Sequence, residues 1–198
     1  MPHNVPSSRC CSRLAMSSDE GTVNELFFTG PGDPRHKCVA IGYHNAAPIV
    51  YKFETIDLPQ GTRTTVTFNE RTIVAYLDWA MSNHLGSVVQ GTERIPMADF
   101  VSRGSIDTAR EFKTTANMNA REAFEWRRLG NRQPHAYELL SITPEATARI
   151  ATYDPTPKEV PKMGRAYAYL RYTFREDTLL RDSLLALCLN RWIDWQGM

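Results

Sequence analysis

Long apolar runs are missing from this chain. The longest unbroken one covers residues 184–189, against the roughly 20 residues that a membrane-spanning helix needs. The first 20 residues are rich in proline, serine and arginine and hold no apolar stretch of the roughly 7 to 15 residues that a secretory signal requires. We therefore expect a cytoplasmic protein that crosses no membrane.

An excess of charge of either sign is also missing. Lys and Arg number 23 and Asp and Glu 22, which gives a formal net charge of +1. This balance excludes binding to nucleic acid or to an anionic membrane through the charge of the whole chain. We expect no nucleic-acid partner, and any anionic partner has to be met by a local patch.

Catalytic and cofactor motifs are absent from the sequence. It holds no GxSxG, no GxGxxG, no phosphate-binding loop of the Walker type and no HExxH. The four cysteines form no CxxC pair, and the five histidines fall in predicted loops or in the N-terminal tail. We expect no cofactor, no metal site and solvated histidines, and we interpret Cys38 and Cys188 as core thiols.

What remains is the composition of a soluble globular domain, with 42% apolar and 23% charged residues. A chain of 198 residues has enough surface to bury for one core and is marginal for two. We expect a disordered arm at residues 1–22 and a single domain at residues 23–198.

Short strand-like stretches, separated by turn residues, fill the chain from Asn24 onward. Residues 62–79 predict a hairpin, because Ile73, Ala75, Leu77 and Trp79 alternate along its second strand as in a sheet with one buried face. Further strands are expected at residues 25–29, 37–42, 49–55, 111–115, 122–128, 136–141, 148–153 and 165–174.

The C-terminal segment has helical spacing instead. Asp177 stands where a helix start favours negative charge, and apolar residues then recur every three or four positions. Residues 184–189 are apolar all round, which is typical of an enclosed helix. We predict a helix at residues 176–195, with the sheet curled around it.

The strand before this helix has two different faces. Its small and apolar residues, among them Ala166 and Ala168, leave room for a closely packed helix, so we assign them to the inside. The outer face then presents Arg165, Tyr167, Tyr169 and Arg171.

The order of these elements resembles a known architecture. It is similar to the tubby-like barrel of tubby C-terminal domains, phospholipid scramblases and plant LURP-one-related proteins, and more closely to a family of small proteins of unknown function from mushroom-forming fungi. The likeness covers about residues 24 to 195 and rests on the ordered stretches LFFTG, PIVYKFET, TRTTV, AYLDW, REFK, FEWR and IATYDP.

The resemblance implies a mostly β fold in which a closed antiparallel barrel of about 12 strands surrounds a central C-terminal helix. One departure is the turn at residues 117–120, which has no glycine where the family has one.

Arginine and tyrosine on neighbouring strands are the strongest candidate site. Arginine binds phosphate in a bidentate manner, and a tyrosine ring rests at the boundary of lipid headgroups. If the strands that carry them lie side by side, they form an anion-binding face. The candidate ligand-binding residues are Arg127, Arg128, Arg165, Tyr167, Tyr169 and Arg171.

Three functions remain open at this point. The first is a non-enzymatic module that binds anionic phospholipid headgroups or a peripheral membrane surface. The second is a protein-interaction or structural module whose contact surface is the loop that runs from Val89 to Ser105. The third is an enzyme acting on a hydrophobic small molecule in the interior, with Asp78, Glu125 and Tyr76 as candidate residues.

Overall fold

The computed structural model describes residues 23–30, 32–81, 84–112, 114, 122–130 and 135–197. The expected N-terminal arm at residues 1–22 and the turn at residues 117–120 lie outside these ranges.

Strands dominate the fold. The first half of the chain holds β1 (Asn24–Thr29), β2 (Cys38–His44), β3 (Ala47–Leu58), β4 (Gly61–Phe68), β5 (Thr72–Trp79), β6 (Ser87–Gln90) and β7 (Glu93–Pro96). The second half holds β8 (Val101–Arg103), β9 (Ala109–Phe112), β10 (Ala123–Arg128), β11 (Tyr137–Ile142), β12 (Thr147–Asp154), β13 (Lys158–Val160), β14 (Gly164–Ala166) and β15 (Ala168–Tyr172).

Thirteen of these strands form one antiparallel sheet, in the order β7-β6-β5-β4-β3-β2-β1-β15-β12-β11-β10-β9-β8. The short helix α1 (Met97–Phe100) joins the two end strands, β7 and β8. Among the described residues no hydrogen-bond ladder pairs these two strands. The mostly β fold, the large antiparallel sheet and the C-terminal helix are confirmed, but the sheet is not closed into a hydrogen-bonded barrel.

The seam between the end strands has a physical reason to stay unpaired. Met97 and Phe100 are 0% and 3% exposed, so α1 fills the gap with apolar side chains packed into the core. Apolar packing of α1 therefore occupies the seam between β7 and β8 in place of a backbone ladder.

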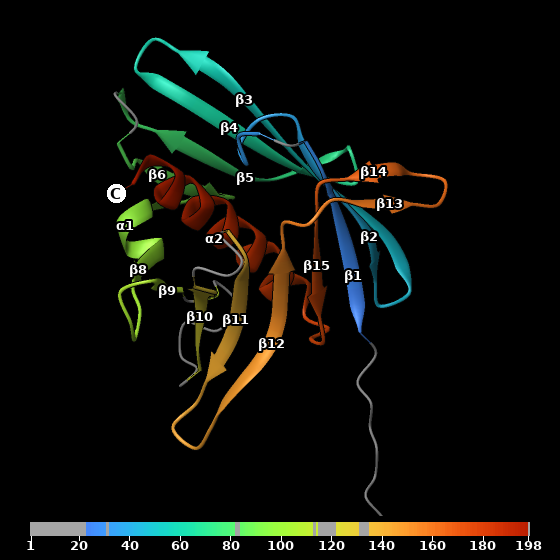
Figure 1. The fold of residues 1–198 in the computed structure, drawn as a ribbon. Helices are drawn as coiled ribbons and strands as arrows, with labels where there is room; N and C mark the ends of the chain where they lie inside the picture. Colours follow the sequence, from blue (N-terminus) through green and yellow to red (C-terminus); the bar gives the residue numbers. More distant parts are fainter. Residues whose placement is uncertain are drawn as a thin grey trace, which may run out of the picture.

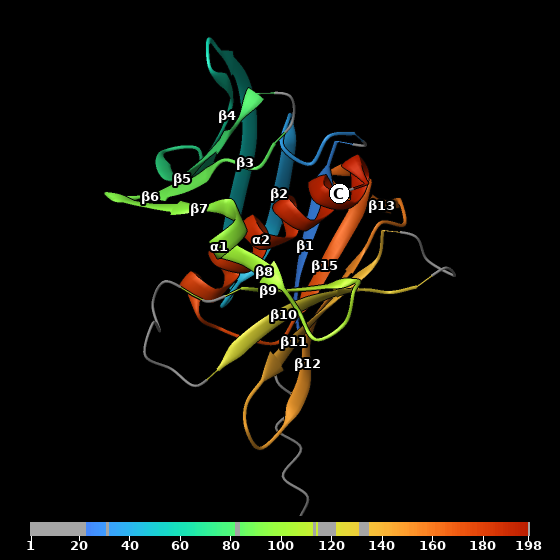
Figure 2. The ribbon, with the colours of Figure 1, turned by 90° about the vertical axis from the view of Figure 1, so that its left-hand side faces the viewer.

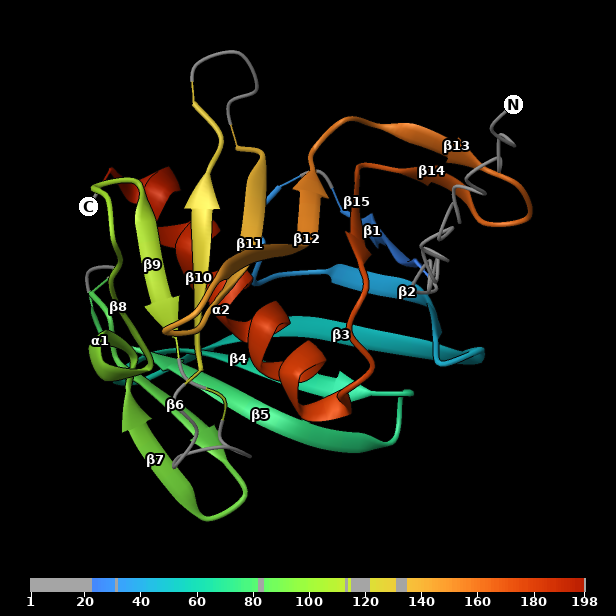
Figure 3. The same cartoon turned by 90° about the horizontal axis from the view of Figure 1, so that it is seen from below.

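The C-terminal helix α2 (Asp177–Gln196) lies inside the curl of the sheet. Figures 1 and 3 show β3, β4 and β5 on one side of it and β10, β11 and β12 on the other, and Figure 2 shows the same enclosure from a third direction. Every residue from 184 to 189 is at most 4% exposed. The helix ends at Gly197, whose φ of 70° is the left-handed conformation that glycine adopts without steric cost.

The predicted hairpin at residues 62–79 is present as β4 and β5, with one departure. Ala75, Leu77 and Trp79 are buried as expected, but Ile73 is 51% exposed. The pairing register shifts between Val66 and Thr67, and this bulge turns the residues beyond it to the opposite face. Ile73 therefore points outward, beside Thr67.

The predicted strand at residues 165–174 is two strands. Its faces are as expected, because Ala166 and Ala168 are buried while Arg165 and Arg171 are exposed. The chain breaks at Tyr167, whose backbone N–H donates to the carbonyl of Phe28 at 2.8 Å. Before the break β14 pairs with β13, and after it β15 pairs with β1 and β12. The hairpin of β13 and β14 projects from the body of the sheet (Figures 1 and 3).

The segment from Val89 to Ser105 is not the loop that the sequence predicts. It holds the end of β6 followed by β7, α1 and β8. Met97 and Phe100 belong to the core, so they are not available as a contact surface. A protein partner for this region stays a prediction.

Candidate functional site

Four of the six predicted ligand-binding residues come together on β14, β15 and the junction between them. The guanidinium carbon of Arg165 lies 5.4 Å from the ring centre of Tyr167, and that of Arg171 lies 4.9 Å from the ring centre of Tyr169. Both distances fall within the range of a cation–π contact. Each of these two arginines therefore contacts a tyrosine on the surface to which the sequence assigns them.

Acidic residues offset part of this charge. Nε of Arg171 donates to Oε1 of Glu25 at 3.0 Å, and the Tyr169 hydroxyl donates to Oδ2 of Asp154 at 2.7 Å. The hydrogen bond to Asp154 raises the pKa of Tyr169, and burial raises it further, so the phenol stays protonated and donates. These hydrogen bonds order the surface, and Glu25 neutralises part of the positive charge of Arg171.

Lys158 completes the cluster and was not among the predicted residues. Its ammonium lies 5.4 Å from the ring centre of Phe27 and 5.5 Å from that of Tyr169, and 3.9 Å from Oε1 of Glu25. Residue 158 precedes the turn that connects β13 to β14, whereas the predicted strand at residues 165–174 begins after this turn. The signal that could have found it is the run from 158 to 165, which places three basic residues around a proline and a glycine.

The β13–β14 hairpin is the more basic part of the site. Lys158, Lys162 and Arg165 stand against the single acid Glu159, which leaves residues 158–166 with a net charge of +2. Among the described residues, no carboxylate forms an ion pair with Lys162 or Arg165. Between the basic positions the turn carries an exposed proline at 161 and a half-buried Met163. We call residues 158–166 the basic hairpin.

Arg127 and Arg128 do not join this site, and the prediction of a single six-residue face is wrong on this point. They lie on β10, which β11 and β12 separate from β15, a separation of about 14 Å at the usual strand spacing. Arg127 contacts Glu125 at 2.8 Å, and Arg128 lies 3.8 Å from Asp194. Alternation along a strand fixes which face a residue occupies, but it does not fix the order of the strands.

Glu125 is buried, although its alternation on β10 predicts an outward side chain. The loop after β8 covers it, and Ser105 donates to the carboxylate from its backbone N–H at 2.5 Å and from its hydroxyl at 2.9 Å. Burial raises the pKa of Glu125, but the hydrogen bonds from Ser105 and Arg127 more than offset this and hold the pKa below its usual range. The group is a structural anion.

Asp78 is in a similar state at the surface. The hydrogen bond from Arg63 at 2.5 Å is the main reason that its pKa lies below the usual range, and Arg94 adds a second contact at 3.0 Å. The third candidate is Tyr76, and the guanidinium carbon of Arg63 lies 4.8 Å from the centre of its ring. Carboxylates held ionised and hydrogen-bonded in this way are poorly suited to general acid–base work, so the enzymatic alternative gains no support from these residues.

His44 differs from the expected solvated histidine. It is 4% exposed at the end of β2, with Nδ1 3.0 Å from the Tyr172 hydroxyl. Its Nε2 lies 3.0 Å from the Arg175 carbonyl and 3.0 Å from the Asp177 carboxylate. The imidazole thus ties the start of α2 to the sheet, and its partners lie more than 100 positions away in the chain, so local pattern could not reveal them.

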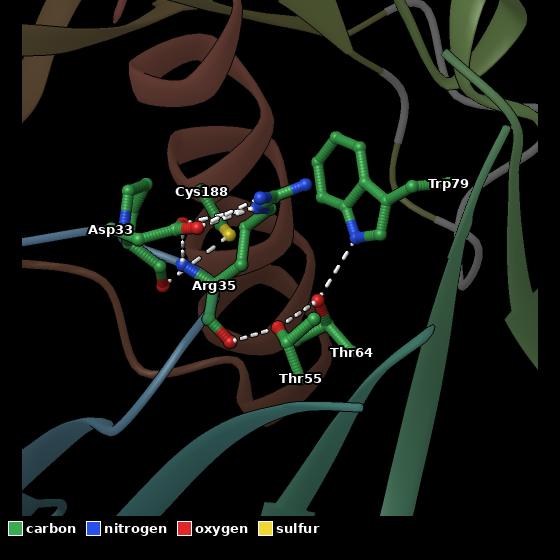
Figure 4. A network of polar contacts seen from close by, with 7 residues as sticks. Asp33, Arg35, Thr55, Thr64, Trp79 and Cys188 are labelled. Carbon is green, nitrogen blue, oxygen red and sulfur yellow. Dashed lines mark hydrogen bonds and ion pairs between the residues drawn. The ribbon is translucent and has the colours of Figure 1, made fainter. Parts of the chain in front are cut away.

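The loop between β1 and β2 closes one end of the sheet over α2 through Arg35 (Figure 4). The Arg35 guanidinium carbon lies 3.3 Å from the ring centre of Trp192 and 4.8 Å from that of Trp79. The Asp33 carboxylate accepts hydrogen bonds from Nη2 of Arg35 at 2.8 Å and from its Nε at 3.0 Å. The carbonyl of Arg35 accepts a bond from Thr55 at 2.7 Å. The loop is therefore fixed against the helix by a buried cation.

Neither helix of the described residues combines the length and the hydropathy of a membrane span. Within the same residues, no group of three or more His, Cys, Asp or Glu side chains is arranged to hold a metal ion.

Comparison with known proteins gives one match. No curated protein and no solved structure matches the chain. A family model described as a family of unknown function, DUF6593, matches residues 33–186, which include every strand from β2 to β15 and the first half of α2. The chain belongs to this family of unknown function, DUF6593.

Proposed function

We propose that the protein is a non-enzymatic module that binds anionic phospholipid headgroups at a membrane surface, through the basic hairpin and the adjoining Tyr169 and Arg171. The observation that carries this proposal is the projection of a hairpin with three cations and one acid from a chain whose total charge is close to neutral. In such a chain a local patch is the only means of meeting an anionic surface by charge.

The expected strength follows from the charge count. Each Lys or Arg near an anionic leaflet contributes about 1 kcal/mol, so Lys162 and Arg165 together predict roughly 2 kcal/mol. Lys158 and Arg171 add little, because both contact Glu25. Met163 at the turn and the ring of Tyr167 supply apolar area at the headgroup boundary, where amphipathic rings are favoured. The resulting attachment is weak, reversible and peripheral, and it weakens with salt.

The kinship with tubby-like barrels is part of the same proposal. Two features support it, namely the enclosed helix and the sheet whose end strands meet at α1. Likeness of fold alone is an associational argument about function, so the decision rests on the hairpin itself.

Vesicle co-sedimentation tests the proposal. The full chain is mixed at low salt with vesicles of phosphatidylcholine and phosphatidylserine, and with vesicles of phosphatidylcholine alone. We expect binding only to the anionic vesicles, and we expect the double variant Lys162→Glu, Arg165→Glu to lose it. Arg71→Glu, an exposed charge reversal in the turn after β4, is the matched control and keeps binding. Equal binding by the double variant and the wild type, or no binding by either, would refute the proposal.

A further inference from the structure

A pocket of about 460 Å³ opens where the C-terminal end of α2 meets the β1–β2 loop and the linker between β12 and β13. Its walls are largely aromatic and proline side chains, including Phe28, Tyr153, Pro155, Tyr167 and Trp195. The volume lies in the lower half of the range of about 300–1,000 Å³ that small-molecule sites occupy. None of the candidate enzymatic carboxylates lines it.

The backbone of the β1–β2 loop gives this pocket a fixed edge. Gly30, which lines the pocket, has a φ of 95°, and a Cβ at this position would lie 2.8 Å from the carbonyl oxygen of Lys37. Only glycine fits this close approach without a shift of the backbone. The opposite side of the loop is held by the contacts of Arg35 with Trp79 and Trp192, so the pocket is preformed on this side.

Arg191 is the cation of this pocket. It projects from α2 into the lining, and its guanidinium carbon lies 5.0 Å from the ring centre of Tyr153. Burial raises the pKa of the Cys38 thiol, and the positive charge of Arg191 and a hydrogen bond with its side chain oppose that shift. The side chain is half-buried, and its position is fixed by an aromatic ring.

No carboxylate of the described residues forms an ion pair with Arg191. The nearby acids are already engaged, because Asp33 binds Arg35 in a bidentate manner and Asp194 binds Arg110 and Tyr137. A half-buried guanidinium in an apolar pocket is stabilised most by an anion that can reach two of its N–H groups. The pocket thus combines one guanidinium that can bind an anion with a lining of mostly apolar residues.

We propose that this pocket binds an amphiphilic carboxylic acid, with the carboxylate on Arg191 and the apolar part along the proline and aromatic wall. This inference does not rest on the proposed membrane function, since its cation is Arg191 and no cation of the basic hairpin lines the pocket; the two sites share the ring of Tyr167.

The local charges favour a monoanion over a dianion. The pocket contains one guanidinium, and it lies at the C-terminal end of α2, where the helix dipole presents partial negative charge. Asp33, which stands between Gly32 and Pro34 of the lining, adds a further carboxylate close to the pocket. One negative charge on the ligand is balanced by the permanent charge of Arg191, whereas for the second charge of a phosphate monoester the described lining offers only the imidazole of His135.

Trp195 supplies a built-in reporter of binding. It lines the pocket and is 57% exposed, whereas Trp79, Trp126 and Trp192 are at most 3% exposed. A ligand that covers the indole removes it from water, so its emission is expected to shift to shorter wavelength. The other three tryptophans contribute a constant background.

The experiment is a fluorescence titration of the full chain with decanoate, with 1-naphthoate, with decanol and with decyl phosphate, all below their micellar concentrations. We expect a saturable blue shift with the two carboxylates, and at least tenfold weaker binding of decanol, because a charged hydrogen bond is worth roughly 1.5–3 kcal/mol. Decyl phosphate is expected to bind more weakly than decanoate at neutral pH.

Variants assign the site. Arg191→Gln is expected to weaken decanoate binding at least tenfold and to leave decanol binding unchanged, while Arg191→Lys keeps the charge and loses less. Lys162→Gln on the basic hairpin is the matched control and changes nothing. Trp195→Phe removes the signal, and calorimetry on this variant should still detect binding. Equal affinity of the wild type and folded Arg191→Gln for decanoate, or no saturable binding of either carboxylate, would overturn the inference.

Discussion

Replacing Arg35 by methionine tests how the β1–β2 loop closes the sheet over α2. The residue is 8% exposed, and its guanidinium contacts the rings of both Trp79 and Trp192. Methionine keeps most of the packing volume but removes the charge. The variant therefore isolates the electrostatic part of the contact.

The magnitude follows from the contacts that are lost. A desolvated cation–π contact is worth about 2 kcal/mol, and the charged hydrogen bonds to Asp33 add roughly 1.5–3 kcal/mol. The side chain of Asp33 keeps 23% exposure, so water recovers part of the second contribution. We expect a loss of about 3 kcal/mol in the free energy of unfolding.

Urea denaturation of four proteins measures this loss, namely the wild type, Arg35→Met, Asp33→Asn and the double variant. The cycle should give a coupling of about 1–2 kcal/mol between the two residues. A loss under about 1 kcal/mol for Arg35→Met would refute the reasoning, because removal of a desolvated cation that contacts two rings should cost more than this.

Two further predictions concern the covered carboxylate of Glu125. Because its folded pKa is depressed, its stabilising contribution is complete above the unfolded value of about 4.3 and is lost as the pH falls below it. Urea denaturation from neutral pH down to about pH 3, which crosses the unfolded value, should therefore show a smaller loss of stability on acidification in Glu125→Gln than in the wild type, and identical losses would contradict this. Gly104→Ala would place a Cβ 2.6 Å from the Glu125 carboxylate and 2.9 Å from Ala109, so we expect a lower melting temperature. Gly32→Ala, with nothing within 4 Å of the added Cβ, is the control and should melt like the wild type.

The sequence pattern predicted those features of the fold that depend only on residues close together in the chain. The faces of β15 and the burial of residues 184–189 both follow from periodicity. The outward turn of Ile73 was missed, because the bulge between Val66 and Thr67 leaves no mark in an alternating pattern. The burial of Met97 and Phe100 was missed because four helical residues are too few to show a period.

The candidate site was predictable only where its residues share a strand or a turn. Arg165 and Arg171 lie on one side because two strands follow each other in the chain, and Arg127 lies elsewhere because strand order depends on long-range pairing. The pocket could not be foreseen, since Arg191 and Tyr153 meet only after the helix has entered the sheet.

Enclosure of α2 by the sheet is the claim on which the placement of both proposed sites depends. Leu185 and Leu187 lie on opposite sides of the helix, and each is 1% exposed. We predict that Leu185→Ala and Leu187→Ala each lower the free energy of urea unfolding by about 2–5 kcal/mol, as expected for fully buried leucines. A loss under about 1 kcal/mol for either variant would contradict the enclosure, because it would mean that one flank of the helix faces water.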